Sequence, residues 1–162
     1  ETNNISITIT QIALKQIYHK GITIRIPEIW NAETEDLTEE DGSISHCISI
    51  SAGETDVRSI DISFGPMPEG SDAYTEACGT YEDVVSEEEL EVNDEPILCF
   101  DFKGREAYGF SLATEDGLPC FFFCINAEHQ GKPYLLTVLL CASGNDELQS
   151  LLEFVEEYIS YQ

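Results

Sequence analysis

Basic residues are scarce in this 162-residue chain, which has 7 Lys and Arg against 32 Asp and Glu and a net charge of −25. Nucleic-acid binding rests on Lys and Arg that neutralise phosphates, so the deficit excludes a nucleic-acid partner. Anionic membranes are disfavoured for the same reason, and no apolar run approaches the roughly 20 residues of a membrane-inserted helix. A basic protein or a cation is the partner that this charge favours.

Sequence signatures of catalysis are also missing. The chain has no G-x-S-x-G elbow, no P-loop and no dinucleotide fingerprint. His46 and Cys47 are adjacent and would lie on opposite faces of a strand, so they cannot form a catalytic pair. We therefore predict a protein that is not an enzyme and has no catalytic residues or cofactor. A hydrolase whose site is assembled from distant residues is the catalytic alternative.

One metal-ligand pattern is present, the C-x3-C-x4-H spacing of Cys120, Cys124 and His129. If 119–126 is a strand, these two cysteines are about 13 Å apart, and one zinc ion with bonds near ~2.3 Å cannot join them. The acidic run 33–42 lacks the ligand spacing of a calcium loop. We therefore predict no metal ligands. The alternative function is binding of a small ligand between sheet and helix, or loose binding of divalent cations.

The six cysteines are too few for a disulfide-rich scaffold. Four of them lie in apolar, strand-like runs, where a free thiol behaves as a small hydrophobic group; these are Cys47, Cys99, Cys120 and Cys124. This setting predicts six reduced thiols and a cytoplasmic protein. The chain does not begin with Met, so removal of a leader before residue 1, or a longer parent chain, stays open.

Alternating apolar and polar residues predict an antiparallel sheet. The predicted strands are 5–10, 22–27, 43–51, 57–64, 97–102, 107–113, 119–126 and 134–142. The segment 11–21 fits either a short helix or a hairpin arm. Apolar positions four residues apart favour a helix at 73–85, and a longer apolar stripe with Leu151 and Val155 predicts a C-terminal helix at 146–161. The segments 31–42, 65–72 and 86–96 have the composition of turns and loops. The result is one α+β domain spanning 1–162, with helices packed against an antiparallel sheet.

Aromatic residues raise two structural questions. The single tryptophan, Trp30, follows a strand that ends at Pro27, and we predict that it is a core anchor. Phe121, Phe122 and Phe123 are consecutive, so they cannot all face one side of a strand. This strand is therefore either covered on both faces or exposes an aromatic side chain that marks a partner site.

Three stretches of the chain resemble the PsbP-like fold family. They are the strand-Pro-x-x-Trp sequence IRIPEIW, the strand and glycine turn in FDFKGREAYGFSLATEDG, and the closing strand and helix in YLLTVLLCASGNDELQSLLEFVEEYI. The resemblance covers nearly the whole chain by pattern and implies a PsbP-like sandwich that serves as a non-catalytic binding scaffold. The family's members differ in function, and none of their functional residues matches a position here.

The acids are concentrated in residues 28–95, where 21 of them accompany a single base, Arg58, for a net charge of −20. We predict a protein-binding module of bacterial type, an adaptor, chaperone or immunity protein, whose partner is another protein of basic character. A homodimer is the alternative assembly. The candidate contact surfaces are the acidic segments 33–41 and 82–95, with Glu39, Glu40, Asp41, Glu87, Glu88 and Glu89 as the candidate partner-binding residues.

Overall fold

The computed structural model describes residues 13–88 and 96–161. The predicted strand at 5–10 lies outside the described residues, and so do residues 89–95 of the predicted charge run.

In the part of the chain that the structure describes, seven antiparallel strands form the central sheet, in the spatial order β3-β4-β5-β9-β8-β7-β6. Their period-two pattern gives the sheet a buried face: on β5, Ile60, Ile62 and Phe64 are buried whereas Asp61 is exposed. The bounds are β3 Asn31–Thr38, β4 Ile44–Ser51, β5 Ser59–Pro66, β6 Leu98–Phe102, β7 Arg105–Ala113, β8 Pro119–His129 and β9 Lys132–Cys141.

A smaller antiparallel sheet has the order β1-β2-β10, with β1 at Leu14–His19, β2 at Ile22–Pro27 and β10 at Ile159–Tyr161. The ambiguous segment 11–21 is thus a hairpin arm rather than a helix. Its turn needs two residues with positive φ, Lys20 at 42° and Gly21 at 102°. Ile22, Ile24 and Ile26 of β2 are fully buried, so this sheet closes one side of the core.

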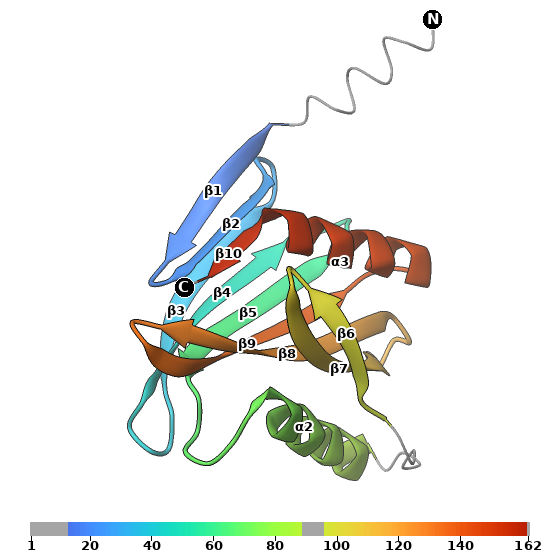
Figure 1. Cartoon of the computed structure of the whole chain (residues 1–162). Helices are drawn as coiled ribbons and strands as arrows, with labels where there is room; N and C mark the ends of the chain where they lie inside the picture. The colour runs from blue at the N-terminus through green and yellow to red at the C-terminus, as the bar shows by residue number, and fades with distance from the viewer. Residues whose placement is uncertain (1–12, 89–95, 162) are drawn as a thin grey trace, which may run out of the picture.

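Within the described residues, two helices cover opposite faces of the central sheet (Figure 1). Leu151 and Val155 of α3 (Asn145–Tyr158) join the main apolar core, which lies between the two sheets and α3. Ala73 and Ala77 of α2 (Ala73–Glu88) pack with Cys124 on the other face. The predicted α+β class, an antiparallel sheet packed against helices, is confirmed.

The aromatic predictions have clear outcomes. Trp30 is 6% exposed, and its ring centroid lies 5.9 Å from that of Phe154, which confirms its role as a core anchor. Phe123 belongs to the main core, whereas Phe122 packs in the second cluster under α2. Strand β8 is therefore covered on both faces.

Several predicted boundaries are wrong, and in two places the structure has a strand that was not predicted. Asn31–Thr38, predicted to be a turn, is strand β3 and pairs with β4 along its whole length. It is an edge strand, and charged side chains are common on edges because they oppose further pairing. The C-terminal helix ends at Tyr158 rather than at 161, since Ile159 is extended (φ −89°, ψ 144°) and begins β10 against β2.

The cysteine prediction is also wrong. Cys120 of β8 and Cys141 of β9 form a disulfide, so the chain has at most four thiols, at Cys47, Cys78, Cys99 and Cys124. The bonded residues are directly opposed across the two strands, with Cα atoms 4.2 Å apart. The inference of a reducing compartment relied on six thiols and loses its basis. Neither α2 nor α3 is long and apolar enough to cross a membrane.

Candidate functional site

The candidate partner-binding acids lie in two separate places. Glu39, Glu40 and Asp41 are exposed in the β3–β4 turn. Glu87 and Glu88 lie in the last turn of α2, and Glu89 lies outside the described residues. The candidate acids within the described residues therefore do not form one continuous surface.

The β3–β4 turn is held in shape by its own polar groups. The carboxylate of Asp41 accepts hydrogen bonds from the backbone N–H of Ser43, at 2.9 Å, and from the Ser43 hydroxyl, at 2.6 Å. These bonds keep the pKa of Asp41 below its usual range. Gly42 has a φ of +86°, a conformation that glycine adopts without steric cost. Asp41 is therefore a shaping residue of the turn, whereas Glu39 and Glu40 are available to a partner.

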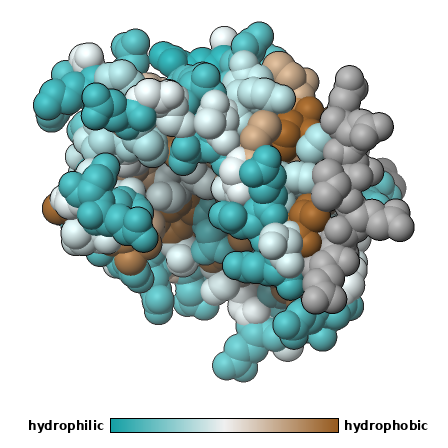
Figure 2. Space-filling model, turned by 90° about the horizontal axis from the view of Figure 1, so that it is seen from below, coloured by the Kyte–Doolittle hydropathy of each residue, from teal (hydrophilic) through white to brown (hydrophobic). Residues whose placement is uncertain are grey.

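An acidic groove of about 520 Å³ separates this turn from α2. Glu39, Glu40 and Asp41 line one side of it. Glu76 lines the opposite side, where it accepts a 2.7 Å hydrogen bond from the Ser71 hydroxyl. No basic side chain is found among the described residues that line the acidic groove. Figure 2, which views the molecule from the α2 side, shows a largely hydrophilic surface with hydrophobic patches between.

Glu87 does not belong to this groove. A helix rises about 1.5 Å per residue, so Glu87 is roughly 16 Å further along α2 than Glu76. The structure therefore joins the first three candidate acids with Glu76, which the sequence analysis did not single out, and separates them from the acids at the end of α2.

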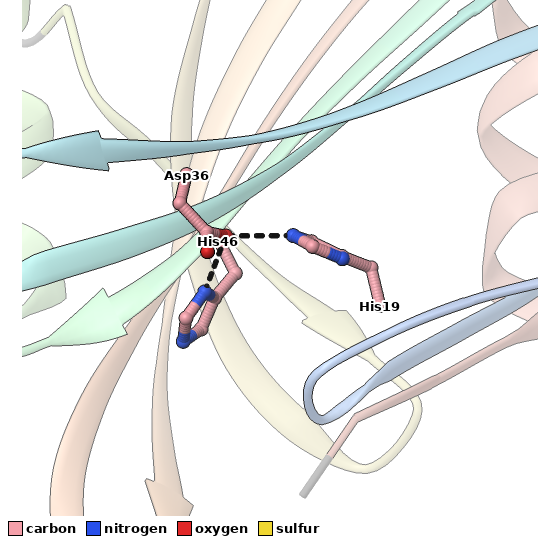
Figure 3. A group of neighbouring side chains, drawn as sticks. All are labelled: His19, Asp36 and His46. Carbon is pink, nitrogen blue, oxygen red and sulfur yellow. Dashed lines mark hydrogen bonds and ion pairs between the residues drawn. The ribbon is translucent and has the colours of Figure 1, made fainter.

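A second cluster of functional groups lies where the two sheets meet (Figure 3). Asp36 of β3 and His46 of β4 are directly opposed across their strands, and His19 is the last residue of β1. Oδ1 of Asp36 lies 2.8 Å from Nε2 of His19 and 2.8 Å from Nδ1 of His46. The three side chains offer two nitrogens and one oxygen that all lie within 4.8 Å of one another. We call these three residues the His-Asp cluster.

The histidines of this cluster interrupt rows of core-facing residues. On β4, His46 lies on the same face as the buried Ile48 and Ile50. On β1, His19 shares a face with Ile17, which packs against the core. Each imidazole is only 16% exposed. Both strands therefore have an imidazole at a position where their alternating pattern predicts an apolar side chain. Both imidazoles contact the carboxylate of Asp36.

Lys20 completes the surroundings of Asp36. Its Nζ lies 2.7 Å from Oδ2 of Asp36, and its side chain is 58% exposed. Hydrogen bonds from Lys20, His46 and His19 hold the pKa of Asp36 well below its usual range. Asp36 is therefore a carboxylate anion at neutral pH.

The sequence analysis missed this cluster. The hairpin turn at Asp41 and Gly42 is a signal that was available, because Asp36 and His46 are each five residues from Asp41 and so face one another if a hairpin closes there. No such signal exists for His19, which comes from the other sheet. Cys120 and Cys124 lie on strand β8, which is the premise on which a shared zinc ion was argued against.

A pocket of about 590 Å³, with apolar side chains on both walls and polar or acidic ones among them, opens between β6 and α3. Its size is typical of small-molecule sites. Phe100 and Phe121 line the sheet side, and Leu148 and Leu152 line the helix side. Leu98, which is 56% exposed, lies at this pocket and shows that it is open to solvent.

Comparison with known proteins identifies the fold. The chain matches no protein-family model and no curated protein. Among solved structures it is similar to the solution structure of cyanobacterial PsbP from Synechocystis sp. PCC 6803, with a TM-score of 0.59. The match covers 93% of this chain and 94% of that one, at 14% sequence identity. The fold is therefore PsbP-like, and at this identity the similarity concerns the fold alone.

Proposed function

We propose that this chain is a non-catalytic binding domain that docks a basic segment of another protein in the acidic groove. The observation that carries the proposal is the groove itself, which is a concave surface with Glu39 and Glu40 on one side and Glu76 on the other. A cationic side chain that enters the groove is attracted from both sides. The net charge of −25 adds a long-range field that steers basic partners toward the chain.

The lining of the groove suits the side chain of Lys or Arg. Serine and threonine hydroxyls between the acidic walls accept hydrogen bonds from ammonium or guanidinium groups, and Pro66, Pro68 and Leu135 offer apolar surface to the aliphatic part of such a side chain. The hydroxyls belong to Ser43, Ser45, Ser63 and Thr137. An extended basic segment would therefore place a charged side chain between the walls and its flanking residues along the exposed β3–β4 turn.

The test uses a short oligolysine peptide and two variants that remove the same charge. Glu39→Gln with Glu40→Gln removes two charges from the groove, whereas Glu54→Gln with Glu115→Gln removes two exposed charges elsewhere. Asp41 is left intact because it shapes the turn. We expect the peptide to shift backbone amide resonances in the β3–β4 turn and at the start of α2, and to bind more weakly to the first variant only.

Equal weakening in both variants would show attraction to net charge without a docking site, and it would refute the proposal. Resonance shifts confined to the end of α2 would also refute it, because they would place the binding surface at Glu87 instead.

A second candidate function is supported by the pocket between β6 and α3. Its lining by Phe100, Phe121, Leu148 and Leu152 suits a small apolar ligand. A neutral environment-sensitive dye such as Nile red should bind there, because Asp101, Glu153 and Glu156 also line the pocket and would repel an anionic probe. Leu98→Gln at the exposed edge should weaken the signal without unfolding the chain. A probe signal that is unchanged in this variant would exclude the pocket as the binding site.

A further inference from the structure

The His-Asp cluster has the composition and placement of a metal site. A row of core-facing side chains normally stays apolar, because burying a polar group has a cost unless it is hydrogen-bonded. Strand β1 of one sheet and strand β4 of the other nevertheless each have a histidine in their core-facing row, and β3 supplies a carboxylate that contacts both imidazoles. A single hydrogen-bonded polar residue in such a row would need no special explanation, but three converging residues, each of a type that binds metals, need a common one.

We propose that His19, Asp36 and His46 bind one divalent first-row transition-metal ion. The ligand atoms are His19 Nε2, His46 Nδ1 and a carboxylate oxygen of Asp36. In a tetrahedral zinc site with bonds of about 2.0–2.2 Å, the ligand atoms lie about 3.3–3.5 Å apart. That spacing falls between the 2.8 Å that now separates each nitrogen from Asp36 Oδ1 and the 4.8 Å within which all three atoms lie. Small side-chain rotations are therefore enough to form the site.

The donor set decides the class of ion. Imidazole nitrogen suits zinc, cobalt, nickel and copper, whereas magnesium and calcium prefer all-oxygen surroundings. Three protein ligands leave a coordination position for water. On binding, each ligating nitrogen exchanges its N–H for a bond to the metal. The imidazole stays neutral by carrying its proton on the other ring nitrogen, which is Nδ1 in His19 and Nε2 in His46.

Lys20 is a built-in competitor for this site. Its ammonium group occupies Asp36 Oδ2 at 2.7 Å and repels a second cation. The side chain is 58% exposed, so it can move into solvent when a metal ion arrives. Removing the Lys20 charge should therefore tighten metal binding, and by more than at a distant adventitious site, where the same charge is screened.

A metal ion at this position would join the two sheets. His19 belongs to the β1–β2 hairpin, and Asp36 and His46 belong to the β3–β4 edge of the central sheet. Because the ion binds only the folded arrangement, saturating metal should raise the melting temperature.

The experiment uses the whole chain, freed of metal with a chelator. Calorimetry with Zn²⁺ measures stoichiometry and affinity, Co²⁺ absorption reports the ligand types, and millimolar Mg²⁺ is the control ion. Ring-nitrogen NMR of the unaltered protein identifies the ligating atoms without any variant. His129, the third histidine of the chain, provides the matched control substitution His129→Gln.

We expect one Zn²⁺ per chain, displacement of Co²⁺ by Zn²⁺, and shifts of His19 Nε2 and His46 Nδ1 but not of the His129 nitrogens. His46→Gln and Asp36→Asn should weaken binding by more than the roughly 10–100-fold caused by loss of an outer-shell partner. His129→Gln should bind as the unaltered chain does, and Lys20→Gln should bind several-fold more tightly.

The proposal is overturned if the unaltered chain binds no Zn²⁺, or if the His19 and His46 ring nitrogens do not shift on binding. Thiolate-to-cobalt charge-transfer absorption would also overturn it, because it would assign the metal to cysteine. In those cases the cluster is a hydrogen-bonded seal at the edge of the core.

Discussion

Gly109 is the position at which a single added methyl group should be most informative. This glycine is buried on β7, directly opposite Phe123 of β8. A Cβ atom built on it would overlap the carbonyl oxygen of Phe122 and would lie 2.7 Å from the Cβ of Phe123. Contacts below about 3.0 Å are essentially never seen for real Cβ atoms, so Gly109→Ala forces the two strands apart.

The expected loss of stability in Gly109→Ala depends on how easily strand β8 can move away from β7. Overpacking a well-packed core costs about 1–3 kcal/mol, and we expect the upper end because the nearest atom belongs to the backbone of β8. That strand is paired with β7 on one side and β9 on the other, so it cannot shift alone. Alanine also restricts the unfolded chain, which returns about 0.4–1 kcal/mol. The net loss of about 2 kcal/mol should lower the melting temperature by roughly 4–8 °C for a chain of this size.

Gly79→Ala is the matched control, with the opposite sign. Gly79 is an exposed residue within α2, and a Cβ added there meets nothing within 4 Å. Glycine in a helix interior is about 0.8–1.0 kcal/mol less favourable than alanine, so this variant should be stabilised. Urea unfolding followed by circular dichroism measures both free energies. A Gly109→Ala variant as stable as the unaltered chain would refute the close packing of β7 on β8.

Three further predictions concern thiols, tryptophan and charge. The denatured, unreduced protein should take up four alkyl groups and the reduced protein six; six without reductant would exclude the Cys120–Cys141 disulfide. In the native protein at pH 8, exposed Cys99 should react well before Cys124, because burial raises the pKa of the Cys124 thiol to about 12. The unfolded chain then loses this proton at a lower pH than the folded chain does, so the free energy of unfolding should fall as pH rises from about 9 toward 12. Trp30 should emit at short wavelength and resist quenching by neutral acrylamide, and Trp30→Ala should cost about 3–5 kcal/mol, whereas solvent-like emission would contradict its burial against Phe154. Raising ionic strength from 0.01 M to 0.15 M shortens the screening length from ~30 Å to ~8 Å and should raise the melting temperature, whereas a fall would mean that ion pairs outweigh acidic repulsion.

The fold could be predicted where burial imposes a pattern. Strands such as Ile22–Pro27 and Ser59–Pro66 alternate apolar and polar residues because one face is buried and the other is not. Strand Asn31–Thr38 could not be predicted in this way, because its residues are mostly exposed and its place in the sheet comes from pairing with β4. The end of α3 was misplaced for a related reason: Ile159 fits the apolar stripe of the helix but is extended and pairs with Ile24 of β2.

Side chains that come together only through the register of paired strands could not be predicted from local sequence patterns. Cys120 and Cys141 each have an apolar setting that fits a free thiol, and only the pairing of β8 with β9 brings them together. The sequence analysis singled out Glu39–Asp41, which form one wall of the acidic groove, but not the groove itself. Glu76 on the opposite wall was not distinguished from the many other acids. His19 required knowledge of how two sheets meet, which no single segment encodes.

The β3–β4 hairpin carries both proposed sites, and this links them through charge. Asp36 and Glu39 are three residues apart, so a metal ion at the His-Asp cluster would place two positive charges about 10 Å from the acidic wall of the groove. At that distance the ion offsets part of the field that attracts a basic segment, and the effect is largest at low salt, when the screening length exceeds the separation. Zinc should therefore weaken oligolysine binding, and by reciprocity the peptide should weaken zinc binding by the same factor. Titrating the peptide into metal-free and zinc-loaded protein measures this factor. Tighter peptide binding in the presence of zinc would contradict the electrostatic argument and would show instead that joining the two sheets shapes the groove for its partner.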